Sequence, residues 1–93
     1  MEFEWDEAKA ESNLQKHGVE FSEAMTVFAD PLSLTVYDPM HSVEEDRYLT
    51  MGTSAAGRLL VVSHTDRGDV LRVISARNAM KRERKDYEDG SFP

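Results

Sequence analysis

The chain contains no cysteine, which excludes a disulfide framework and a thiolate metal site. Histidine is also sparse. His17, His41 and His64 lie too far apart in the sequence to form a local metal-ligand motif. We therefore expect the protein to work without a metal ion or any other cofactor.

Long apolar runs are absent as well. No stretch approaches the roughly 20 apolar residues that a membrane-spanning helix needs. Three of the first six residues are acidic and none is basic, whereas a secretory signal peptide begins with basic residues. We expect a cytoplasmic protein without membrane contact, and its 93 residues suit one domain that spans positions 1–93.

Positive charge is scarce overall, and most of it lies in the second half of the chain. The formal net charge is -7 and the sequence pI is about 4.8. Nine of the eleven basic residues nevertheless lie between positions 47 and 85, together with only three acidic ones. The nine are Arg47, Arg58, Arg67, Arg72, Arg77, Lys81, Arg82, Arg84 and Lys85. Such an asymmetry indicates a polyanionic ligand or an oppositely charged protein partner.

Two helices are predicted in the acidic first half. The first spans 7–16, because Asp6 can cap its start and Gly18 can adopt the left-handed conformation that ends a helix. The second begins at a Ser22 cap and ends at Asp30, since a residue that precedes proline is pushed out of the helical region.

The second half predicts strands and one further helix. Runs rich in β-branched and aromatic residues, each bounded by Pro, Gly, Asp or Ser, predict strands over 32–37, 47–54, 58–65 and 70–76. Gly57 and Gly68 predict tight hairpins between the last three strands, and Asn78 can cap a helix over 79–89. The elements predict an α+β fold: two N-terminal helices packed on a four-stranded, mainly antiparallel sheet, followed by a C-terminal helix.

The two faces of this sheet can be assigned if both hairpins have two-residue turns. One face then has an apolar centre with charges at the strand ends, as expected beneath helices. It carries Arg47, Leu49, Met51, Arg58, Leu60, Val62, His64, Leu71, Val73 and Arg77. The other, open face carries Tyr48, Thr50, Leu59, Val61, Ser63, Val70, Arg72 and Ile74. A single bulge in either hairpin would exchange part of the two sets.

Three side chains of the strand region are candidates for chemistry. Arg72 stands in mid-strand, where its guanidinium can clamp a phosphate or can be an ordinary solvated strand residue. Arg77 ends the last strand and can reach a site, cap carbonyls or pair with acidic residues. His64 can act as a general base, because imidazole titrates near neutral pH, or can be a buried core histidine.

The segment 81–87 predicts a charge-dense helix surface. Its basic residues are Lys81, Arg82, Arg84 and Lys85. Most such surfaces are only solvated, but the excess of bases over acids favours contact with phosphates. Glu83 can accept a proton or pair with a neighbouring base, and Tyr87 can stack on a nucleobase or donate a proton.

Blocks of sequence that follow one another over residues 3–88 carry a resemblance to a known family. They are Phe3-Glu4-Trp5-Asp6-Glu7-Ala8-Lys9, Asn13-Leu14-Gln15-Lys16-His17-Gly18-Val19, residues 24–31, Arg72-Val73-Ile74-Ser75-Ala76-Arg77 and Arg82-Glu83-Arg84-Lys85-Asp86-Tyr87-Glu88. In this order they resemble the BrnT family, small ribonuclease toxins of bacterial type II toxin–antitoxin systems. The Trp-Asp-Glu-x-Lys opening together with Lys-His-Gly is the most specific part.

The resemblance implies a RelE-like fold, with helices on one face of a small sheet and the active groove on the opposite face and the C-terminal region. It also implies metal-independent RNA cleavage that inhibits translation. The implied partner is a BrnA-type ribbon-helix-helix antitoxin, through which alone operator DNA is contacted. The family's strand histidine and strand-end arginine match His64 and Arg77, and the arginine before the Ile-Ser-Ala segment matches Arg72. The acidic pI departs from what a free RNA-binding enzyme leads one to expect.

RNA supplies its own nucleophile, the 2′-hydroxyl, so a small protein has only to align it, remove its proton and neutralise charge on the phosphorane. On this hypothesis Arg72 and Arg77 hold the phosphate, while His64 or Glu83 handles protons. Contacts with the RNA backbone then come from Arg47, Arg58, Lys81, Arg82, Arg84 and Lys85, with Tyr87 as a stacking residue. The sequence leaves two alternatives open: a non-catalytic interaction module or degenerate toxin that acts with its antitoxin, and an RNA binder that does not cleave.

Overall fold

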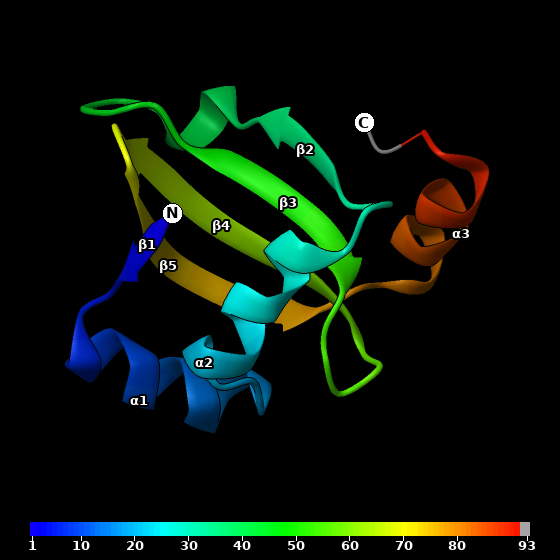
Figure 1. Ribbon diagram of the computed structural model, residues 1–93, viewed down its shortest axis with the longest axis horizontal. Coiled ribbons are helices and arrows are strands. Elements are labelled where there is room, and N and C mark those ends of the chain that lie inside the picture. Colours follow the sequence, from blue (N-terminus) through cyan, green and yellow to red (C-terminus); the bar gives the residue numbers. More distant parts are fainter. Residues whose placement is uncertain (92–93) are drawn as a thin grey trace.

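The computed structural model describes residues 1–91, and within them the strands form one five-stranded sheet (Figure 1). The strands are β1 (Glu2–Glu4), β2 (Leu34–Tyr37), β3 (Tyr48–Thr53), β4 (Leu59–Arg67) and β5 (Val70–Asn78). Their order across the sheet is β1-β5-β4-β3-β2, with β1 parallel to β5 and every other pair antiparallel. The expected α+β class is confirmed, but the sheet has one strand more than predicted.

The additional strand is β1, in the acidic amino terminus. The sequence does not reveal this strand, because two of its three residues are glutamates and three residues are too few to show an alternating pattern. Phe3 pairs in register with Leu71 and packs against Phe28, with 5.6 Å between the ring centroids. Parallel pairing with a strand more than sixty residues away leaves no local signal.

The helices are α1 (Glu7–His17), α2 (Phe21–Ala24) and α3 (Lys81–Asp89), with short 3-10 helices at Met25–Ala29 (η1) and Pro39–His41 (η2). α1 begins and ends as predicted: Asp6 accepts the Lys9 backbone N–H at 3.0 Å, and Gly18 is left-handed with φ 69°. The predicted second helix is instead α2 followed by η1, and Glu20, not Ser22, precedes it. α3 starts after Met80, not Asn78, because β5 continues through Asn78.

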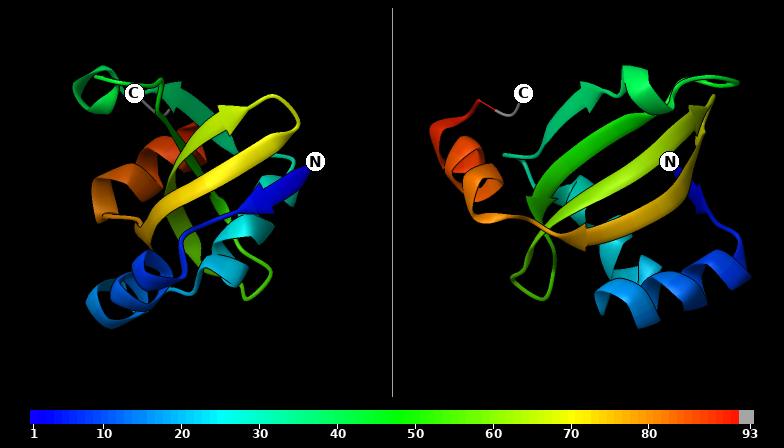
Figure 2. Two further views of the ribbon diagram at one scale, coloured as in Figure 1. Left: turned by 90° about the vertical axis from the view of Figure 1, so that its left-hand side faces the viewer. Right: turned by 180° about the vertical axis from the view of Figure 1, so that it is seen from behind.

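α1 and α2 cover one face of the sheet and enclose the main core. The core residues are Val19, Phe21, Ala24, Val27, Leu60, Val62, Leu71, Val73 and Ala76. α3 stands at one end of the opposite face, where Ala79 and Tyr87 pack against Met51, Leu59 and Val61. Seen from behind, the strands pass in front of α2, and α1 lies below them (Figure 2, right). Within residues 1–91 no helix is long and apolar enough to cross a membrane.

The two hairpins differ in their turns. β4 and β5 meet in the predicted two-residue turn, with Arg67 paired to Val70 and Gly68 at φ 64°. The loop between β3 and β4 has three residues, 55–57, because the Ser54 N–H donates to the Arg58 carbonyl at 2.8 Å and Gly57 supplies the left-handed position at φ 82°.

This longer loop shifts the register of β3 by one residue. Met51 therefore lies opposite Val61, whereas Thr50 lies opposite Val62. The prediction that Leu49 and Met51 lie beneath the helices was wrong, as was the placement of Tyr48 and Thr50 on the open face, since a shift of one residue exchanges the faces of a strand.

A bulge in β5 changes the face of a second group. Ser63 pairs with Ser75 and His64 pairs with Val73, so Ile74 is an extra residue in β5. Beyond the bulge the alternation is inverted, which brings Arg77 to the same face as Arg72. The predicted placement of Arg77 beneath the helices was wrong, and so was the alignment of Ile74 with Arg72. Arg72 on the open face is confirmed.

Candidate functional site

The sheet face that points away from α1 and α2, the open face, gathers polar side chains from β4 and β5. Arg72, Ser75 and Arg77 come from β5, and Ser63 lies opposite Ser75 on β4. The two serines are half-buried between the arginines. At about 3.3 Å per strand residue, the backbones of Arg72 and Arg77 lie roughly 16 Å apart, and their guanidiniums bind different carboxylates, those of Glu4 and Glu83. They can contact separate phosphates of one extended strand.

Arg77 joins the end of β5 to α3. Its Nη1 and Nη2 donate to the two carboxylate oxygens of Glu83 at 2.7 and 2.9 Å, and the Met80 backbone N–H donates to the same carboxylate at 2.9 Å. The hydrogen bonds from Arg77 hold the pKa of Glu83 below its ordinary value, and the Glu83 carboxylate raises the pKa of Arg77. Glu83 is therefore an ionised carboxylate in a fixed position at neutral pH.

Arg72 lies at the other end of the open face. Its Nη1 donates to the Glu4 carboxylate at 2.6 Å, across the parallel pair of β1 and β5. Both side chains are partly exposed, so solvent screens the pair and an anionic ligand can compete with Glu4 for the guanidinium.

α3 carries the strongest concentration of positive charge. The α3 cation cluster comprises Lys81, Arg82, Arg84 and Lys85, all of them exposed. Among residues 1–91 no carboxylate lies within ion-pair distance of any of the four. The cluster lines a shallow surface pocket together with Glu88 and Asp89. It is therefore available to a polyanion without the loss of an internal ion pair.

Tyr87 has a structural position on α3. Its hydroxyl donates to Asp30 at 2.6 Å, and its ring packs against the cluster around Met51. The bond to Asp30 raises the pKa of Tyr87 above its ordinary value. Because the ring is half-buried against the sheet, it anchors α3, and its geometry does not favour stacking on a nucleobase.

His64 lies on the covered face, as predicted, with 3 % of its side chain exposed. Its Nδ1 donates to Asp66 at 2.9 Å, and its Nε2 lies 2.7 Å from the Thr50 hydroxyl. The ring packs edge-on against Phe28 and is stacked on Tyr48. Burial lowers the pKa of His64, and Asp66 offsets this lowering only in part. His64 and Arg72 therefore lie on opposite sides of the sheet and cannot meet at one phosphate.

Arg58 falls outside the open-face cluster, and Arg47 lies just before β3. Arg58 Nε donates to Glu23 at 3.0 Å and its Nη2 donates to the Gly18 carbonyl at 3.2 Å, so this guanidinium ties the β3–β4 loop to the helices. Arg47 lines a pocket of ≈ 290 Å³ beneath the acidic loop that follows β2, and its Nε is buried without a hydrogen-bond partner in the part of the chain described. Thr65, which pairs with Arg72, donates to the Asp46 carbonyl at 2.9 Å, so the chain at Arg47 runs beside β4 at the level of Arg72, while Arg58 is held at the helices.

A basic cluster on α1 was not among the predicted site residues. Lys9, Lys16 and His17 line a cavity of ≈ 180 Å³ against β5, and Ser75 of the open face lines the same cavity. The recurrence of Lys9, Ser12 and Lys16 at helical spacing is visible in the sequence, but its proximity to β5 is not.

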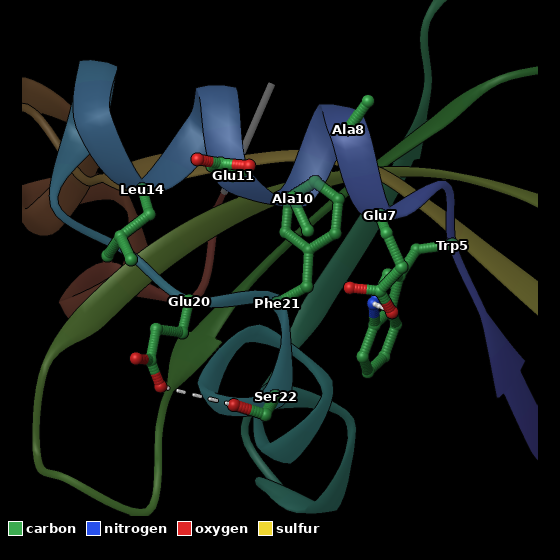
Figure 3. A pocket seen from close by; sticks show the side chains of 9 residues that line it. All are labelled: Trp5, Glu7, Ala8, Ala10, Glu11, Leu14, Glu20, Phe21 and Ser22. Atoms are coloured by element: carbon green, nitrogen blue, oxygen red, sulfur yellow. Dashed lines mark hydrogen bonds between the residues drawn. The ribbon is translucent and has the colours of Figure 1, made fainter.

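The other side of α1 forms an acidic groove with α2, shown in Figure 3. This groove has a volume of ≈ 590 Å³ and is lined by Trp5, Glu7, Ala8, Ala10, Glu11, Leu14, Glu20, Phe21 and Ser22. Its base is apolar and its rim carries three glutamates, a surface that repels phosphates and suits an apolar side chain flanked by basic ones.

Comparison with known families identifies the chain. A family described as the ribonuclease toxin BrnT of type II toxin-antitoxin systems matches residues 5–83. The chain belongs to this BrnT family. The match includes Arg72, Arg77 and Glu83 but ends before Arg84 and Lys85. No curated protein matches the chain.

A solved structure supports the BrnT assignment. The crystal structure of the Brucella abortus ribonuclease toxin BrnT aligns with a TM-score of 0.63 and 26% sequence identity, over 87% of this chain and 99% of that one. The resemblance read from the sequence is thus confirmed, and with it the general class, a ribonuclease toxin of a type II system. Membership of that class implies an antitoxin partner and an RNA target.

Proposed function

We propose that this BrnT-family chain is a metal-independent endoribonuclease that acts in the cytoplasm and inhibits translation by cutting RNA held on its open face. The bulge at Ile74 carries the proposal, because it brings Arg72 and Arg77 to one face. Arg77 also binds Glu83 of α3, the helix that carries the α3 cation cluster. A single RNA strand laid along β5 toward α3 would meet Arg72 and Arg77, whose partners Glu4 and Glu83 it must compete with, and then the α3 cation cluster.

The chemistry uses the 2′-hydroxyl of the RNA. Its oxygen forms a bond to the neighbouring phosphorus, the bond from phosphorus to the 5′-oxygen breaks, and the products are a 2′,3′-cyclic phosphate and a 5′-hydroxyl. The hydroxyl proton passes to a base, and the leaving oxygen takes a proton from solvent. Arg77 stabilises the additional negative charge of the phosphorane, while Arg72 binds a phosphate further along the strand.

Glu83 is the better of the two proton acceptors suggested by the sequence. It lies beside Arg77, it is ionised at neutral pH, and its Oε2, which accepts a single hydrogen bond, keeps a lone pair. His64 is sealed on the opposite face by Phe28 and Tyr48. We therefore give Glu83 the base role and His64 a structural one.

The antitoxin partner is proposed to be of the BrnA type, with a ribbon-helix-helix portion that contacts operator DNA. The toxin chain then has no direct contact with DNA. This part of the proposal rests on the family and on the implied antitoxin. A short reading frame next to this gene that encodes a ribbon-helix-helix protein would support it.

The test is expression of the protein alone in a bacterial host, with growth and RNA integrity as readouts. The wild type should arrest growth and degrade RNA, and the double variant Arg72→Ala/Arg77→Ala should do neither while keeping its fold by circular dichroism. Arg67→Ala, in the β4–β5 hairpin, is the matched control and should stay toxic. Undiminished RNA decay in the double variant refutes the assignment.

A non-catalytic interaction module is the competing function, and the ion pairs favour it. Four arginines of the strand region form ion pairs with glutamates of the same chain: Arg58 with Glu23, Arg67 with Glu45, Arg72 with Glu4 and Arg77 with Glu83. If the protein is such a non-catalytic module, expression of the wild type leaves growth and RNA intact. A binder that does not cleave is recognised by salt-sensitive RNA binding with intact RNA recovered.

A further inference from the structure

We propose that the cavity between α1 and the edge of β5, the edge pocket, binds a backbone phosphate of the RNA. Its polar residues are Lys9, Ser12, Asn13, Lys16, His17 and Ser75. The inference rests on the proposed function, since it extends the RNA path of the open face around the edge of the sheet.

The edge pocket is built where β5 loses its neighbour. β1 pairs with β5 only as far as Arg72, so the later part of β5 is a sheet edge. Asn13 of α1 covers that edge: its Nδ2 donates to the Ala76 carbonyl at 2.8 Å, and its Oδ1 accepts the Ala76 N–H at 3.0 Å. These bonds hold one face of α1 against β5. Lys9, Ser12 and Lys16 occupy that face because residues three and four apart are neighbours on a helix.

The chemistry of the lining fits a phosphate group. Two ammonium groups, an imidazole and two hydroxyls can donate hydrogen bonds, and within residues 1–91 no carboxylate lines the cavity. Its volume of ≈ 180 Å³ is roughly six times the share of one water molecule in the liquid, so a phosphate fits without displacing side chains. The nearby Asp6 carboxylate is committed to the Lys9 backbone N–H at the start of α1.

Helix stability alone does not explain this lining. Lys16 and His17 lie in the last turn of α1, where cations interact favourably with the helix dipole. Lys9 lies in the first turn, where a cation is disfavoured. The acidic residues Glu7 and Glu11 occupy the opposite face, beside the acidic groove. α1 thus presents its lysines to β5 and its glutamates to α2.

Ser75 connects the edge pocket with the open face. The bulge at Ile74 turns Ser75 toward Ser63 on the open face, between Arg72 and Arg77. The same Ser75 lines the edge pocket. An RNA strand that crosses the edge of β5 at this point can keep one phosphate on the open face and place another in the pocket.

The test measures binding of a fluorescein-labelled, single-stranded 2′-O-methyl RNA, which cannot be cut through its 2′-oxygens. The variant Lys9→Gln/Lys16→Gln should bind about fivefold more weakly or worse, and the slope of log affinity against log salt should fall by about 0.7, the loss of one phosphate contact on a single strand. The conservative variant Lys9→Arg/Lys16→Arg should bind like the wild type.

The matched control is Ala8→Glu/Gln15→Glu, which changes the net charge by the same amount at the positions directly before the two lysines. It should keep affinity within twofold, because both positions lie outside the edge pocket. Equal affinity in the lysine variant and the wild type overturns the inference, and so does an equal loss in lysine variant and control. In both cases the proposed function stands if the wild type still cuts unmodified RNA; a wild type that neither binds nor cuts RNA overturns both proposals.

Discussion

Arg77 contributes to the candidate site on the open face, and its guanidinium also attaches α3 to β5 through Glu83. It makes two parallel hydrogen bonds to Glu83 and retains exposed donors, since 35% of its side chain is accessible. A planar fork of donors is needed for this geometry, and an ammonium group does not reproduce it.

Arg77→Lys should therefore reduce RNA cleavage at least tenfold although the net charge is unchanged. The free energy of unfolding should fall by only about 1 kcal/mol, because the pair is partly exposed. Single-turnover cleavage and urea denaturation measure the two effects. Cleavage at the wild-type rate would show that Arg77 acts only as a positive charge.

His64 makes a separate prediction about pH. Because burial holds its pKa below the ordinary 6.5, the unfolded chain takes up the proton at a higher pH than the folded protein does. The free energy of unfolding should be highest above pH 6.5 and should decrease as the pH falls toward 5. His64→Gln should lose about 1–2 kcal/mol at pH 7.5 and show a weaker decrease between pH 7.5 and 5.

Urea denaturation at several pH values measures this difference, and cleavage by the folded fraction of His64→Gln should equal that of the wild type. Loss of cleavage in a fully folded His64→Gln protein would instead restore His64 as the catalytic base.

At the scale of elements, Asn13 replaces a missing strand. Its amide satisfies both backbone groups of Ala76 and also donates to the Val19 carbonyl at 3.0 Å, all in a buried position. Asn13→Ala leaves these groups without partners and should lower the free energy of unfolding by about 3 kcal/mol. Asn13→Asp keeps the acceptor for the Ala76 N–H but turns a buried carboxylate oxygen toward the Ala76 and Val19 carbonyls, so it should lose at least as much as Asn13→Ala; chemical denaturation measures both losses.

The element scale also separates what the sequence predicts from what it does not. α1 was predicted within one residue because its signals, Asp6 and Gly18, are local. Which side chains of β3 and of the end of β5 lie on each face was not predicted correctly. These faces depend on a three-residue loop and on a single extra residue, Ile74, and neither changes the composition of a strand.

The candidate site follows the same division. The sequence singled out Arg72, Arg77 and Glu83, and the structure places them on or beside the open face. The sequence also suggested His64 as a proton acceptor beside these residues, but His64 lies on the other face of the sheet. Lys9 and Lys16 were not among the predicted site residues, because their proximity to β5 depends on the docking of α1 through Asn13, a contact across 63 positions of the chain.

For the whole molecule, the arrangement of charge matters more than its sum. A net charge of -7 disfavours RNA at long range, and the acidic groove between α1 and α2 accounts for part of it. The α3 cation cluster, which forms no ion pair within residues 1–91, lies against the opposite face of the sheet from this groove, whereas Arg72 and Arg77 are paired with Glu4 and Glu83. RNA binding should therefore depend strongly on the salt concentration despite the acidic pI.

Replacement of the α3 cation cluster by glutamine should abolish most RNA binding and leave stability nearly unchanged, because all four side chains are exposed. Fluorescence anisotropy across a salt series and a thermal melt measure both quantities. Unaltered affinity would move the RNA path away from α3.

The central claim is that the open face cuts RNA through the RNA's own 2′-hydroxyl. Its most direct test incubates the purified protein with end-labelled RNA in the presence of EDTA, beside the same RNA carrying 2′-O-methyl groups throughout. We predict fragments that end in 2′,3′-cyclic phosphate from the unmodified RNA and no fragments from the methylated one. Intact unmodified RNA, or cutting of both, would contradict the account.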